Sequence, residues 1–98
     1  MPDKASFLKA RYCRAVLKTA LHSPEEDARQ LVYCLVTEAP TPNVSPEIGA
    51  AERGALEALA ILARRVEERG AAAIATHWKE TNDVIEIWVK AAYQADVY

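Results

Sequence analysis

The sequence predicts an all-α fold, a small bundle of about four helices with a long antiparallel helical hairpin in its C-terminal half. Alanine is abundant and glycine scarce, with 3 in the chain, and alanine loses no side-chain entropy in a helix. Apolar residues recur at helical spacing, and Ser-Pro-Glu, which is typical of helix starts, occurs twice. A chain of 98 residues fits one domain, so we predict a single helical domain over residues 1–98.

The first helix is expected over residues 3–21. Its predicted apolar side consists of Ala5, Tyr12, Cys13, Val16, Leu17 and Ala20. The opposite side carries a basic stripe with an aromatic residue in its middle, formed by Lys4, Phe7, Arg11, Arg14 and Lys18.

The second helix has the clearest start signal. Ser23 at the N-cap and Glu26 three residues later predict a capping box with a proline between them. The helix is expected to end near Glu38, because prolines follow at positions 40 and 42. Residues 40–45 are therefore predicted to form a short, stiff loop.

The hairpin is predicted from two apolar seams at 4-3-4 spacing. The seam of residues 46–69 contains Ile48, Glu52, Ala55, Leu59, Leu62 and Val66. The seam of residues 71–96 contains Ile74, Trp78, Thr81, Ile85, Trp88, Ala92 and Ala95. Residues 71–96 could form one long helix, two helices that meet near Thr81, or a strand over 84–91; the helical forms explain more residues. The seams also suggest a homodimer.

Charge is distributed unevenly along the chain. The net charge is −2, yet residues 1–22 carry five basic residues and one acidic residue, a net of +4, whereas the remainder has a net of −6. No global field therefore attracts nucleic acid.

Two groups of residues are candidates for partner binding. The basic stripe, Lys4, Phe7, Arg11, Arg14 and Lys18, could meet an acidic surface, although a solvated outer face explains it as well. Tyr93 and Tyr98 lie off the seam or in the tail, and tyrosine is frequent at interfaces. Trp78 and Trp88 are expected to be core or dimer residues.

No catalytic, nucleotide or metal motif is recognisable, so we predict no catalytic residues, no metal site and no cofactor. The residues Cys13, His22, Cys34 and His77 lack the close pairing of zinc ligands, and the two cysteines are expected to be free thiols. A small enzyme or ligand carrier built around His77, Asp83 and Trp88 is a third hypothesis.

These observations favour a non-enzymatic interaction module, an accessory subunit, regulator or inhibitor that docks on a larger protein or complex. The alternative is a nucleic-acid-associated regulator that uses the basic first helix. Since the sequence shows neither the apolar stretch of a secretory signal nor a membrane span, we expect a cytoplasmic protein.

Overall fold

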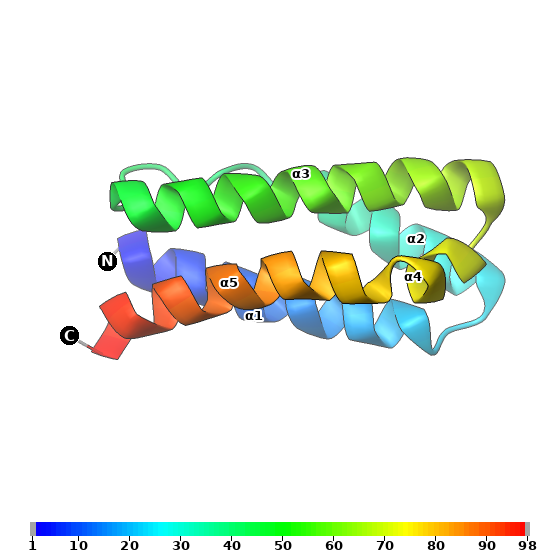
Figure 1. Ribbon diagram of the computed structural model, residues 1–98, viewed down its shortest axis with the longest axis horizontal. Coiled ribbons are helices and arrows are strands. Elements are labelled where there is room, and N and C mark those ends of the chain that lie inside the picture. The colour runs from blue at the N-terminus through cyan, green and yellow to red at the C-terminus, as the bar shows by residue number, and fades with distance from the viewer. Residues whose placement is uncertain (1, 98) are drawn as a thin grey trace.

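The computed structural model describes the backbone of residues 2–97 and the side chains of residues 3–93. Its helices are α1 (Pro2–Leu21), α2 (Glu25–Val36), α3 (Pro46–Arg69), α4 (Ala72–Thr76) and α5 (Trp78–Val97), with no strand in the described range. They form an elongated bundle of 40 × 19 × 18 Å (Figure 1). The predicted all-α fold is confirmed, and the alternative of a strand over 84–91 is wrong, because those residues lie in α5.

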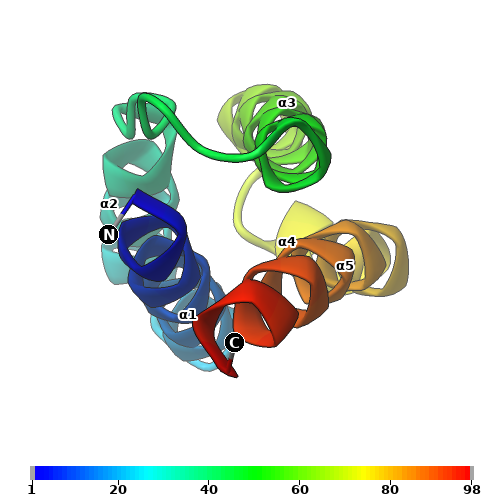
Figure 2. The same cartoon turned by 90° about the vertical axis from the view of Figure 1, so that its left-hand side faces the viewer.

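The four longer helices occupy the corners of the bundle when it is viewed along its length (Figure 2). The helix α1 packs against α5 and α2, and α3 packs against α5 and α2 in turn. Figure 1 shows α5 running back along α3 in the opposite direction. Tyr98, one of the two predicted binding tyrosines, lies outside the described residues.

The break in residues 71–96 falls earlier than the polar residues at positions 81–83 suggest. At Gly70 the backbone adopts a φ of +88°, a conformation that residues with a side chain rarely adopt. The short helix α4, of 5 residues, follows. The chain departs from helical geometry at His77, where φ is −108° and ψ is 18°. Thr81 then donates its backbone N–H to the His77 carbonyl at 3.2 Å, so α5 runs through Thr81 without interruption.

Most residues of the two seams are buried within the single chain. The side chains of Leu59 and Leu62 from α3 and of Ile85 and Trp88 from α5 are fully buried in a single core. These side chains pack within the monomer, and the homodimer that the two seams suggested stays a prediction.

The buried side of α1 differs from the predicted one. Tyr12 was expected to face the core, yet 51% of its surface is exposed, and Ala5 is exposed as well. Because α1 packs against both α2 and α5, its buried stripe is instead centred on Ser6, Ala10, Cys13, Leu17 and Ala20.

The predicted capping box of α2 is not formed. Ser23 donates its hydroxyl to the Thr19 carbonyl at 2.7 Å, and Pro24 occupies the N-cap without a side-chain bond. The carboxylate of Glu25 accepts the Ala71 N–H at 2.9 and 3.1 Å instead, which joins the start of α2 to the turn between α3 and α4. The first turn of α2 therefore lacks the predicted side-chain cap, and its Glu25 makes a tertiary contact that the sequence did not predict.

A buried chain of hydrogen bonds connects α1, α3, α5 and the loop before α3. The Trp88 indole N–H donates to Ser6 Oγ at 2.8 Å, and the Ser6 hydroxyl donates to the Glu52 carboxyl at 2.6 Å. The second oxygen of Glu52 accepts the Thr41 N–H. Ser6, Glu52 and Trp88 are all 0% exposed, so this network fixes how the three long helices align.

The two cysteines lie in different environments. Cys13 is buried and Cys34 is exposed, and both are free thiols. Burial raises the pKa of the Cys13 thiol to about 12, and the nearby Glu38 adds to the shift. No described helix has the combination of length and apolar character that crossing a bilayer requires.

Candidate interaction surface

The predicted basic stripe lies beside α5. Lys4, Arg11 and Lys18 are exposed, whereas Arg14 is partly buried. Within residues 3–93, no ion pair involves Lys4, Arg11 or Lys18. Arg14 alone is matched, because its guanidinium donates to the Glu86 carboxylate of α5 at 3.0 Å. Three of the four cations on this stripe are therefore without a carboxylate partner among the described side chains.

Phe7, the aromatic residue in the middle of the stripe, packs against α5. Its ring is partly buried and lies 5.7 Å from the Tyr93 ring, measured between centroids, with the planes tilted by 45°. The Arg11 guanidinium lies 5.7 Å from the centre of the Phe7 ring, within the range of a cation–π contact. Tyr93 remains 54% exposed, so it is the more accessible of the two rings.

Next to this aromatic pair, α1 and α5 enclose a groove of about 550 Å³, which we call the basic groove. It is lined by Arg11, Arg14, Ala15, Lys18, Trp78, Asn82 and Glu86. Ala15 contributes only a methyl group, and this leaves room between the long basic side chains. We refer to the basic groove together with Lys4, Phe7 and Tyr93 as the α1–α5 face.

The sequence analysis missed the contribution of α5 to this groove. Trp78 was assigned to the seam; its partly buried side chain does pack against the core, and it also lines the groove. Trp78, Asn82 and Glu86 recur every four residues, which places them on one side of a helix. That spacing was visible in the sequence, but nothing indicated that this side of α5 would lie beside the basic stripe.

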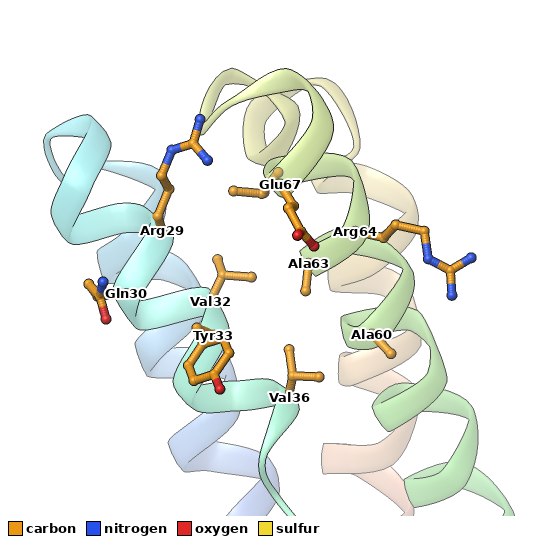
Figure 3. A pocket seen from close by; sticks show the side chains of 10 residues that line it. Arg29, Gln30, Val32, Tyr33, Val36, Ala60, Ala63, Arg64 and Glu67 are labelled. Carbon is orange, nitrogen blue, oxygen red and sulfur yellow. The ribbon is translucent and has the colours of Figure 1, made fainter.

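A second groove of about 600 Å³ lies between α2 and α3 (Figure 3). Its apolar wall includes Val32, Val36 and Ala63, and Tyr33 beside them is 68% exposed. Its rim carries both Arg64 and Glu67. Because the rim carries both positive and negative charge, it favours neither an acidic nor a basic partner.

The candidate metal ligands are not brought together as a set. Cys13 is buried on the inner side of α1, whereas Cys34 is exposed on α2. Among the side chains that the structure describes, no group of three or more His, Cys, Asp or Glu residues could hold a metal ion.

The residues of the enzyme hypothesis are separated as well. Trp88 is buried against Ser6, whereas Asp83 is exposed and pairs with Lys79 at 3.3 Å. His77 and Trp88 stand eleven residues apart, which corresponds to about 16 Å along a helix.

His77 instead belongs to a surface ion-pair cluster. Its Nδ1 lies 2.5 Å from the Glu80 carboxylate, which Arg65 of α3 contacts at 3.0 Å. The hydrogen bond from His77 and the charge of Arg65 lower the pKa of Glu80. The other ring nitrogen of His77, Nε2, is buried and has no hydrogen-bond partner among the described residues.

In comparisons with known proteins, no family model, curated sequence or solved structure matches this chain significantly.

Proposed function

We propose that this protein is a non-enzymatic interaction module that docks through its α1–α5 face on an acidic surface of a larger protein. The observation that carries the proposal is the basic groove, where Arg11, Lys18 and Trp78 line one hollow of about 550 Å³. Cations that have no carboxylate partner among the described side chains, placed around an apolar wall, are the complement of an acidic surface with an apolar centre.

The chemistry of the face fits a protein partner better than a catalytic role. Trp, Tyr and Arg are the residues that most often dominate binding energy at protein interfaces, and Trp78, Tyr93 and Arg11 lie on this face. Arg14 and Glu86 form a pair in the middle of the groove, where they can fix the register of a docked surface.

A nucleic-acid ligand stays a prediction of the basic first helix, and the groove supports it less well. The Glu86 carboxylate lines the groove and would repel a phosphate backbone. Outside residues 1–22 the chain carries thirteen acidic and seven basic residues, so a polyanion meets repulsion over most of the sequence.

The proposal is tested by affinity capture of the tagged protein from a lysate of its source, with nuclease treatment and washes of rising salt. The double variant Arg11→Glu/Lys18→Glu reverses two cations of the groove that have no ion-pair partner among the described residues. The matched control, Arg53→Glu/Arg64→Glu, makes the same change in charge on exposed positions of α3.

The expected result is a stoichiometric protein partner that the wild type and the α3 control retain at low salt and that the groove variant loses. Circular dichroism and thermal melting establish that all three proteins are folded. A partner held equally by all three folded proteins would contradict the proposal. Binding that disappears on nuclease treatment would favour the nucleic-acid alternative instead.

A further inference from the structure

The cations of the basic groove follow a helical repeat that a partner can match. Arg11 and Lys18 are seven residues apart on α1, which is two turns and about 10 Å along the helix axis. Ala15 lies between them, four residues after Arg11 and three before Lys18, so all three occupy the same side of α1. Two cations without an ion-pair partner among residues 3–93 therefore stand on either side of a position with almost no side chain.

The opposite wall supplies apolar surface at both ends of the face. Trp78 of α5 is eight residues, or about 12 Å of helix, from Glu86, which pairs with Arg14, so Trp78 lies at the Lys18 end of the groove; Phe7 and Tyr93 pack together at the other end of the face. Tyr93 and Trp78 are fifteen residues apart on α5, which spans about 22 Å of helix. The α1–α5 face is thus a depression between two helices, with aromatic side chains towards each end and positive charge between them. We refer to this depression as the valley.

We propose that the segment of the partner that docks in this valley is a single acidic amphipathic helix. Two of its carboxylates stand seven residues apart and pair with Arg11 and Lys18. An apolar side chain midway between them fills the space over Ala15. This inference rests on the proposed function, because it specifies which part of an acidic partner enters the groove.

A helix fits the valley better than an extended segment does. Both walls are helices whose backbone groups are already bonded internally, so they offer no row of N–H and C=O groups to an extended chain. A helix satisfies its own backbone hydrogen bonds and needs only side-chain contacts. It also repeats at the same rise per residue as α1, so a seven-residue spacing on the partner matches the spacing of Arg11 and Lys18.

Glu86 restricts which order of side chains on a partner helix the valley can bind. Its carboxylate pairs with Arg14 at 3.0 Å, so the centre of the groove is close to neutral while Arg11 and Lys18 stay positive at either side. Glu86 would repel an acidic side chain at the centre, whereas it would not repel an apolar one. The valley therefore selects acidic, apolar, acidic in that order along one side of the partner helix.

The test uses two synthetic peptides of identical composition, both stapled into helices and labelled with fluorescein. In the matched peptide, two glutamates seven residues apart flank a leucine on the same side of the helix. In the shifted peptide, the second glutamate is moved to the opposite side. Fluorescence anisotropy at low ionic strength is expected to show up to about fivefold tighter binding of the matched peptide, because the shifted peptide loses one of the two surface ion pairs.

A steric variant locates the bound peptide. Ala15 is exposed and lines the groove, so Ala15→Leu fills the space between Arg11 and Lys18 while it leaves every charge in place, and leucine is also a good helix former. The matched control is Ala60→Leu, an equivalent change in the groove between α2 and α3. Ala15→Leu is expected to weaken binding of the matched peptide at least about tenfold, with melting temperature unchanged, and Ala60→Leu is expected to leave binding as it is.

Equal binding of the two peptides would overturn the helical register and leave only non-specific attraction to the basic face. Absence of binding by the matched peptide, or weakening by Ala60→Leu but not by Ala15→Leu, would overturn it too. None of these outcomes affects the capture experiment with Arg11→Glu/Lys18→Glu, so failure of this inference is distinguishable from failure of the proposed function.

Discussion

On its inner side α1 places Ser6 between Glu52 and Trp88, whereas on the side it shares with α5 it places Arg11 and Lys18 around a groove. In the interior, Ser6 both donates and accepts, and each carboxyl oxygen of Glu52 receives a donor. On the groove side, the two cations have no carboxylate partner within residues 3–93.

The difference separates the polar groups that hold the fold from those that remain for a partner. An unmatched polar group costs free energy in the interior, so the buried groups are matched by the chain itself. A surface cation costs little without a partner, so it can be kept for binding. We therefore expect interior changes to lower stability, and groove changes to lower binding while stability is kept.

The largest expected contrast concerns the two thiols. Because burial raises the pKa of Cys13 from 9.0 to about 12, its reactive thiolate is about a thousandfold scarcer than in an unshifted thiol at the same pH. Ellman's reagent should therefore modify Cys34 rapidly in the folded protein and Cys13 only after unfolding. Rapid reaction of both thiols under native conditions would show that the inner side of α1 is open to solvent.

Truncation of the buried carboxyl group should have the next largest effect. Glu52→Ala removes the acceptor for both Ser6 and the Thr41 N–H, and we expect it to lower the free energy of unfolding by about 3 kcal/mol. Urea denaturation followed by circular dichroism measures this loss. The exposed Glu57→Ala on the same helix is the control, and it should change stability by less than about 0.5 kcal/mol.

The two tryptophans sharpen the comparison, because one belongs to each region. Trp88→Phe removes a buried indole N–H and leaves a small cavity, so it should cost about 2 kcal/mol of stability. Trp78→Phe should cost less than about 1 kcal/mol but weaken binding of the matched peptide. Denaturation and anisotropy on both variants provide the comparison; the reverse pattern would mean that Trp78 is the structural residue.

The smallest expected effect is on the acid limit of stability. The hydrogen bond from Ala71 N–H, with the Arg29 contact, lowers the pKa of Glu25 below its ordinary value of 4.5. A lowered pKa contributes stability that is present above the unfolded value and is lost as pH falls through the folded one. Glu25→Gln should therefore lower the melting temperature slightly at neutral pH and reduce the further decrease between about pH 4.5 and pH 3. An unchanged acid profile would contradict this role of Glu25.

The sequence predicted much of the fold because repeated apolar spacing reports which side of a helix is buried. The seam residues Leu59, Leu62 and Ile85 are core residues, and α3 begins at Pro46 and ends at Arg69 within the predicted range. Spacing does not report which helix faces which side. For this reason Tyr12 was placed inwards, and the link from Glu25 to Ala71 was missed.

The candidate site was predicted in part for the same reason. The basic residues of α1 share one side of a helix, and this was visible from their spacing. Trp78 and Glu86 line the same groove only because α5 packs antiparallel to α1, a pairing between segments more than sixty residues apart. Local pattern carries no information about such distant pairings.

The central claim, that the α1–α5 face binds an acidic partner, is tested most directly by changing the charge of the groove in both directions. Glu86→Gln removes the one carboxylate that lines it, and Arg11→Glu/Lys18→Glu reverses two of its cations. In salt washes of the captured complex, we predict that the partner is released at higher salt than from wild type for Glu86→Gln and at lower salt for the double variant. Release at the same salt concentration from all three folded proteins would contradict the claim.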